Sequence, residues 1–169
     1  MPVQATALRA VPAPAEAPDA SELAARLSAG FGPRDLPDRL RAIRDAIPGR
    51  IVFTTAFGLE GQAIVHAIFD TGLAIDVVTL DTGRLFPETY EVWAQTEQRY
   101  RRRIRGYFPE QERVEGFIAR EGINAFRNSI EARHACCHIR KVEPLRRALH
   151  RTRHRAWRHG CPTDRRADR

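Results

Sequence analysis

The sequence of 169 residues lacks the features of a membrane or secreted protein. No apolar run approaches the roughly 20 residues that a membrane-spanning helix needs, and residues 1–20 lack the apolar core of a signal peptide. Three cysteines, two of them adjacent, are too few for a disulfide framework. The 43% of hydrophobic residues excludes a wholly disordered chain. We therefore expect a cytoplasmic protein with one globular domain.

Lysine is nearly absent, because the 28 basic residues comprise 27 arginines and Lys141. The formal net charge of +7 comes entirely from residues 146–169, which carry nine arginines and two aspartates, whereas residues 1–145 are balanced. The basic stretch contains no recognisable nucleic-acid-binding motif and one aromatic residue, Trp157. Charge alone supports a nucleic-acid partner, and we do not predict one.

The chain divides into three segments by composition. Residues 1–20 are rich in alanine and proline and are predicted to be a disordered leader, residues 21–149 form the folded domain, and residues 150–169 form an arginine-rich tail. Within the domain, β-branched and apolar runs that predict strands alternate with segments of helical periodicity. This order predicts an α/β fold with a parallel sheet flanked by helices. The expected strands are 51–55, 75–80 and 104–108, and the expected helices are 21–30, 35–47, one containing 64–69, 87–101, 110–120 and 138–149.

The first candidate site follows the first strand, where residues 54–62 read Thr-Thr-Ala-Phe-Gly-Leu-Glu-Gly-Gln. A strand-to-helix turn directs backbone N–H groups and the positive end of the helix toward one point, which favours an anion such as phosphate. Gly58 and Gly61 permit close approach of a ligand to the backbone. An ordinary turn that uses glycine only for its geometry remains an alternative.

The second candidate site, Leu80–Arg84, follows the next strand and reads Leu-Asp-Thr-Gly-Arg. Ligands of open parallel sheets bind outside the carboxyl ends of the strands, so the two turns are expected to share a pocket. Asp81 and Thr82 are candidates to bond a sugar or base, and Arg84 to pair with phosphate or sulfate. The alternative is an Asx turn in which Asp81 bonds its own backbone.

The third candidate site surrounds the adjacent thiols of Cys136 and Cys137, with basic residues close by. Adjacent thiols suit soft metals or iron–sulfur clusters, and nearby cations stabilise thiolates. A zinc site from 134, 136, 137 and 138 is a second possibility, although four ligands within five residues strain a tetrahedron. A pair of reduced, unliganded cysteines at a helix start is the third.

Taken together and in this order, the motifs resemble those of the assimilatory sulfonucleotide reductases. The nearer match is the bacterial adenosine 5′-phosphosulfate (APS) reductase branch, rather than the cluster-free enzymes that act on 3′-phosphoadenosine 5′-phosphosulfate (PAPS). The resemblance extends from Ile51 to about Leu149. It rests on residues 54–60, on Leu80–Arg84 with the following Leu-Phe-Pro-Glu-Thr, and on Arg133, Cys136, Cys137, Arg140, Lys141, Val142, Pro144 and Leu145.

The resemblance implies an adenine nucleotide α-hydrolase-like fold with a modified pyrophosphate loop and the reduction of APS to sulfite and AMP, with thioredoxin as electron donor. Cys136 and Cys137 would be two of the four ligands of a [4Fe–4S] cluster, and Lys141 would link the cluster region to the substrate electrostatically. The nucleophile in the family is a mobile C-terminal cysteine. The implied substrate-binding residues are Thr55, Ala56, Phe57, Gly58, Leu59, Glu60, Leu80, Asp81, Thr82, Gly83, Arg84, Arg133, Arg140 and Lys141.

The sequence departs from the family pattern in two places. Ala56 stands where the family usually has serine, and the loss of one charge-assisted hydrogen bond is expected to weaken substrate binding by about 1.5–3 kcal/mol. After residue 149 the family's further cysteine pair and its nucleophilic cysteine are not recognisable, and Cys161 is the one remaining thiol. We therefore expect an aberrant tail, from a frameshift or a mispredicted end, and no catalytic residue in these 169 residues.

The sequence leaves three hypotheses for the function. The first is a sulfonucleotide reductase fragment that does not turn over unaided, with APS or, as an alternative, PAPS as its substrate. The second is a nucleotide-binding remnant without catalysis. The third is a nucleic-acid-binding protein that uses its basic tail, whose binding would fall steeply with added salt.

Overall fold

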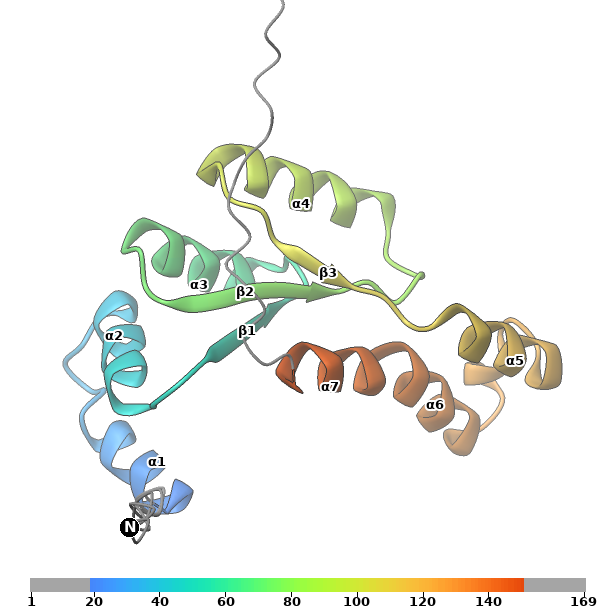
Figure 1. Ribbon diagram of the computed structural model, residues 1–169, viewed down its shortest axis with the longest axis horizontal. Helices are drawn as coiled ribbons and strands as arrows, with labels where there is room; N and C mark the ends of the chain where they lie inside the picture. The colour runs from blue at the N-terminus through green and yellow to red at the C-terminus, as the bar shows by residue number, and fades with distance from the viewer. Residues whose placement is uncertain (1–18, 151–169) are drawn as a thin grey trace, which may run out of the picture.

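The computed structural model describes residues 19–150, and its centre is a three-stranded parallel sheet in the order β1-β2-β3 (Figure 1). The strands are β1 (Ile51–Thr55), β2 (Ile75–Leu80) and β3 (Arg105–Tyr107). Thr55 pairs with Thr79, and Leu80 pairs with Tyr107, so the carboxyl ends of all three strands lie at one edge. The predicted parallel α/β sheet is confirmed. Nearly all of the expected leader, and the expected tail with Trp157 and Cys161, lie outside the described residues.

Helices lie on both sides of the sheet, with α3 and α4 on one side and α7 on the other (Figure 1). No helix among residues 19–150 is long and apolar enough to cross a membrane. The helical elements are α1 (Ala20–Ala29), α2 (Leu36–Ala46), α3 (Leu59–Asp70), α4 (Pro87–Tyr100), α5 (Gln111–Glu121), η1 (Ala125–Arg127), α6 (Ile130–Cys137), η2 (His138–Val142) and α7 (Glu143–His150).

The two faces of the sheet follow from the alternation of side chains along each strand. In β2, Ile75 and Val77 join the cluster that packs against Val65 and Ile68 of α3. Val78, on the other face, packs with Ala148 of α7, which is completely buried. Because both faces are covered, the strands read as continuous apolar runs in the sequence, as is usual for parallel sheets.

Arg50 joins the amino ends of the strands to the end of α7. Its Nε lies 2.6 Å from Asp76 Oδ2, and its Nη1 donates to the carbonyl of Ala148 at 2.6 Å. The adjacent residue of α7, Arg147, donates to the carbonyl of Phe108 after β3. These bonds fix α7 across the sheet, and with it the segment that carries the two cysteines.

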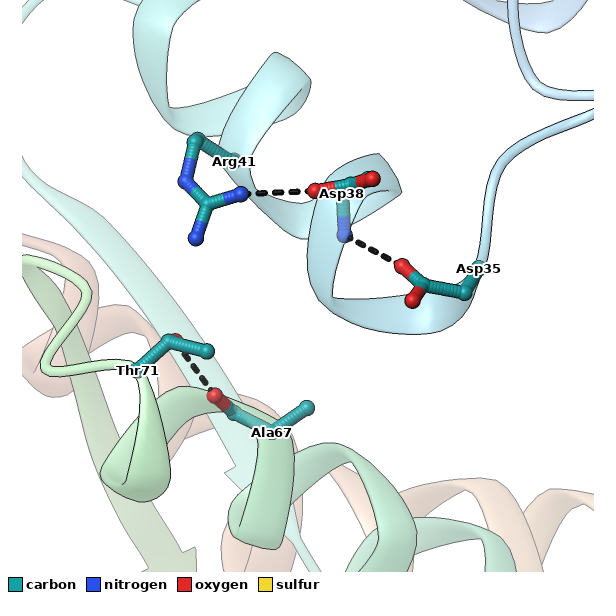
Figure 2. A network of polar contacts seen from close by, with 5 residues as sticks. All are labelled: Asp35, Asp38, Arg41, Ala67 and Thr71. Atoms are coloured by element: carbon teal, nitrogen blue, oxygen red, sulfur yellow. Dashed lines mark hydrogen bonds and ion pairs between the residues drawn. The ribbon is translucent and has the colours of Figure 1, made fainter.

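Helix α2 begins with a side-chain cap (Figure 2). The carboxylate of Asp35 accepts a 3.0 Å bond from the backbone N–H of Asp38, and Asp38 pairs with Arg41 at 2.6 Å. Such a cap satisfies a donor that the first helical turn leaves open. At the end of neighbouring α3, the Thr71 hydroxyl donates to the carbonyl of Ala67 at 2.5 Å. Side-chain hydrogen bonds therefore stabilise the start of α2 and the end of α3, two helices that pack against each other.

The structure differs from the sequence expectation after residue 129. We expected a single helix over 138–149, whereas the helical path already begins at Ile130 and runs through α6, the π-helical turn η2 and α7. The cysteine pair therefore ends α6 instead of preceding a helix. Pro144 lies inside this continuous helical path, directly after η2, where its missing N–H removes a helical hydrogen bond. Strand β3 is three residues long, shorter than the expected 104–108.

Gly106 in β3 tests how tightly α4 packs on the sheet. A Cβ at this position would lie 2.6 Å from Trp93 Cη2 and 3.0 Å from Phe108 Cε2. Overpacking of this kind typically costs 1–3 kcal/mol, so we expect Gly106→Ala to lower the free energy of unfolding in urea by about that amount. Gly116→Ala is the matched control, because its Cβ would meet nothing closer than 3.6 Å within α5. That variant is expected to gain about 0.5–1 kcal/mol; equal effects of the two would contradict the packing.

Candidate functional site

The candidate site lies at the carboxyl edge of the sheet, where the turns after β1 and β2 meet. The Thr79 hydroxyl donates to the Thr55 carbonyl at 2.9 Å, and both side chains are buried. This bond joins the last residue of β1 to the neighbouring strand. The structure therefore brings Thr55–Glu60 and Leu80–Arg84 to the same edge.

The first turn is shaped by Phe57, which adopts a φ of 62° that residues other than glycine rarely adopt. The Phe57 ring is buried and stacks on Trp93 with centroids 5.7 Å apart, while its backbone N–H donates to Thr55 Oγ1 at 3.0 Å. Burial of the ring and this bond offset the cost of the backbone conformation. The chain is thereby turned so that Ala56 and Gly58 face solvent.

Helix α3 begins immediately after this turn without a side-chain cap. Gly58 is the N-cap residue, and no side chain accepts a bond from the first helical turn. Uncapped N–H groups at a helix start attract anions. The backbone of Gly61 lies so close to Thr55 that a Cβ at this position would be 2.9 Å from Thr55 Oγ1, which explains the glycine.

The second turn is organised by the carboxylate of Asp81, which is 4% exposed. Asp81 Oδ1 accepts a 2.8 Å bond from the N–H of Gly83, and Oδ2 accepts a 2.8 Å bond from the Tyr90 hydroxyl. The Asx turn considered above is therefore present, and Gly83 has a φ of 69°. The bond to Asp81, with desolvation and the nearby negative charge, raises the pKa of the Tyr90 phenol. In this structure Asp81 shapes the turn and does not point an unbonded oxygen at solvent.

Arg84 reaches away from the turn to the segment between α5 and α6. Its Nη2 donates to the carbonyl of Ile123, and its guanidinium lies 4.8 Å from the centroid of the Phe126 ring. Arg133 of α6 also reaches this segment, with its Nε 3.5 Å from the Phe126 carbonyl. The 123–126 segment is therefore connected to both the second turn and α6.

The two cysteines at the end of α6 are free thiols. Cys136 is buried against Phe117, Ala125 and Ile139, and Cys137 is half-buried. No group of three or more His, Cys, Asp and Glu side chains within residues 19–150 is placed to hold a metal ion. The zinc arrangement of residues 134–138 is therefore not supported.

Arg140 and Lys141 follow the cysteine pair in η2 and differ sharply in their surroundings. Arg140 is buried, and its Nη1 donates to the carbonyl of Thr82 at 2.6 Å. Lys141 is exposed, and it enters no ion pair with the part of the chain that the structure describes. The Arg140–Thr82 bond brings the third candidate motif to the second, across 58 residues of sequence.

Three positions that shape the site were not singled out from the sequence. Tyr90 holds Asp81, Thr79 joins the strand ends, and Phe126 receives the guanidinium of Arg84. The position of Thr79 within a strand gave some signal, because it precedes the Leu80–Arg84 motif directly. Tyr90 and Phe126 depend on contacts between separate elements, and no local pattern marks them.

Comparison with known proteins agrees with this geometry. Residues 50–169 match the phosphoadenosine phosphosulfate reductase domain. The chain is 47% identical over 131 residues to adenosine 5′-phosphosulfate reductase of Agrobacterium fabrum, covering 78% of this chain and 50% of that protein. It is 49% identical over 115 residues to the Rhizobium meliloti enzyme of the same name, covering 68% and 43%. The chain thus spans about half the length of these relatives.

A solved structure gives the same assignment at the level of the fold. The phosphoadenylyl-sulfate reductase of Candida auris, crystallised as a phosphate complex, superposes with a TM-score of 0.62 at 25% sequence identity. The match covers 79% of this chain and 63% of that protein. With turns, sheet and sequence in agreement, the chain belongs to the phosphoadenosine phosphosulfate reductase domain family.

Proposed function

We propose that the chain is the nucleotide-binding part of a reductase that converts adenosine 5′-phosphosulfate to sulfite and AMP. The observation that carries the proposal is the meeting of three motifs at one edge of the sheet. The turn after β1 and the turn after β2 are joined by the Thr79–Thr55 bond, and the cysteine-bearing segment reaches the second turn through Arg140.

The chemistry of the edge suits a phosphosulfate ester of adenosine. The uncapped start of α3 supplies N–H donors for the phosphosulfate group. Lys141 supplies a positive charge beside the cysteine pair. Leu59 and Phe86 are 84% and 76% exposed at the starts of α3 and α4 and provide apolar surface for a purine. The names of the Agrobacterium and Rhizobium relatives favour APS over PAPS as the substrate.

A [4Fe–4S] cluster does not fit the described residues as a complete site. Such a cluster takes four thiolates, and residues 19–150 contribute Cys136 and Cys137. The pair suits one side of a cluster whose other ligands come from elsewhere, and we derive no step of the reaction through it. Thioredoxin as the electron donor and a cytoplasmic location, where the thiols stay reduced, belong to the same proposal.

Titration calorimetry of the 169-residue protein with APS, PAPS and AMP tests the proposal. We expect saturable binding of APS that persists at 0.5 M salt, and weaker binding of PAPS, whose additional 3′-phosphate distinguishes the two substrates. Tighter binding of PAPS than of APS would identify PAPS, the alternative, as the substrate. Absence of binding by all three nucleotides would contradict the proposal, and a nucleic-acid interaction that collapses with salt would favour the basic tail instead.

Gly61→Ala examines the first turn directly. The new methyl group would meet Thr55 Oγ1 at 2.9 Å and displace the hydroxyl that holds the Phe57 N–H. Loss of one positioned hydrogen bond is worth about 0.5–1.5 kcal/mol, so we expect APS affinity to fall about 2- to 10-fold. Gly116→Ala, in α5, is the control and should leave the affinity unchanged. Equal affinities of Gly61→Ala and the parent protein would exclude this turn from the site.

A further inference from the structure

Arg140 is the buried cation of the cysteine-bearing segment. It is 7% exposed and forms no ion pair within residues 19–150. It donates a hydrogen bond from Nη1 to the backbone carbonyl of Thr82 at 2.6 Å. Burying a guanidinium is costly unless its surroundings compensate, and here the compensation comes from a turn that belongs to the nucleotide site.

The backbone of Arg140 lies one helical turn after the cysteine pair. Cys136 and Cys137 precede Arg140 by four and three residues, and η2, which contains Arg140, is π-helical. Such turns are rare and are often found at functional sites. Ile139, within η2, packs in the same cluster as Cys136. Cys137 is the N-cap residue of η2. We therefore expect a change in bulk at either thiol to displace the turn that carries Arg140.

At the nucleotide side, Arg140 contacts the most constrained part of the second turn. A Cβ on Gly83 would lie 3.3 Å from Arg140 Nη1, and Gly83 has a positive φ with its N–H bonded to Asp81 Oδ1. Movement of the guanidinium therefore removes a bond to Thr82 and loosens the packing against Gly83 together. Neither contact involves the nucleotide itself.

We propose that Arg140 is a positioning residue that couples the state of the Cys136–Cys137 pair to the conformation of the Thr82–Gly83 turn. Modification of the thiols and closure of the turn influence each other through the Arg140–Thr82 bond. An effect of this turn on nucleotide affinity rests on the proposed function. The coupling between the thiols and the turn does not rest on it.

Hydrogen exchange of the Gly83 amide measures the coupling without any nucleotide. The protein carries Cys161→Ser, so that iodoacetamide reacts with the half-buried Cys137, as checked by mass spectrometry. We expect carbamidomethylation to accelerate Gly83 exchange about tenfold, within the usual range of coupling between sites. In Arg140→Gln the acceleration should fall below about twofold. Arg140→Lys, which keeps one donor and the charge, should restore part of it.

Arg146→Gln is the matched control, because it removes the same charge from an exposed position of α7 and should retain the full acceleration. Unchanged Gly83 exchange after alkylation of the parent, or acceleration that survives in Arg140→Gln, would overturn the coupling. Thermal unfolding of each variant shows whether Arg140→Gln remains folded; if it does not, the Arg140→Lys result decides.

Protection from alkylation gives the reciprocal measurement, because coupling between two sites acts equally in both directions. Bound APS should slow alkylation of Cys137 about tenfold in the parent and less than about twofold in Arg140→Gln. Protection that persists in Arg140→Gln would mean that the nucleotide covers the thiol directly, against the proposal. Failure of APS to bind would count against the proposed function alone, since the exchange experiment still decides the coupling.

Discussion

Asp81→Ala is expected to lower the free energy of unfolding by about 2–3 kcal/mol and to remove detectable APS binding. The substitution leaves the Gly83 N–H and the Tyr90 hydroxyl without their common acceptor. The Gly83 bond is partly buried and its acceptor is charged, and such a bond is worth about 1.5–3 kcal/mol. Tyr90 is 41% exposed and recovers a bond from water. The positive φ of Gly83 then loses the bond that stabilises it. Urea unfolding and titration calorimetry measure the two effects.

Asp81→Asn and Tyr90→Phe separate the two bonds of this carboxylate. The asparagine keeps an acceptor for the Gly83 N–H, so we expect it to retain most of the stability and part of the affinity. Tyr90→Phe removes only the partly exposed bond and should cost less than about 1 kcal/mol. If Asp81→Ala bound APS as the parent does, the second turn would not belong to the nucleotide site, whatever its stability.

The sheet could be predicted because its residues encode it locally. The run Ile51–Thr55 and the run Ile75–Leu80 consist largely of β-branched and apolar residues, and the structure places strands with these same bounds there. A sheet covered by helices on both faces requires such continuous apolar strands. Pro87 and Pro48 likewise marked a helix start and a helix end, because proline lacks the N–H that a helix interior uses.

The π-helical turn and the contacts of Arg84 could not be predicted in the same way. Residues 130–137 have little amphipathic periodicity, so the start of α6 gave no clear signal. Arg140 in η2 bonds a carbonyl 58 residues away, and Arg84 bonds a carbonyl 39 residues away. Motif spacing identifies such residues as candidates, but only the folded chain shows which of them hold backbone and which remain open to a ligand.

A polypeptide of these 169 residues is expected to bind APS and to release no sulfite, even with reduced thioredoxin present. In the reaction that the family resemblance implies, a cysteine thiolate attacks the sulfate sulfur, an S–S bond forms as the S–O bond to AMP breaks, and AMP leaves. The thioredoxin dithiol then supplies two electrons, becomes a disulfide and releases sulfite. The step requires a thiol that is free to approach the bound phosphosulfate group.

The described thiols do not meet this requirement. Cys136 is buried among apolar side chains, and Cys137 ends a helix that Arg140 and Arg133 fix to the rest of the site. Cys161 lies outside the described residues, within an arginine-rich sequence. Release of labelled sulfite from APS is the measurement, with Cys161→Ser as the control. Thioredoxin-dependent sulfite formation that disappears in Cys161→Ser would identify Cys161 as the nucleophile and contradict the prediction. If APS binds, no sulfite is released and the mass spectrum shows no S-sulfocysteine, the reaction is blocked at thiolate attack and not at the thioredoxin step.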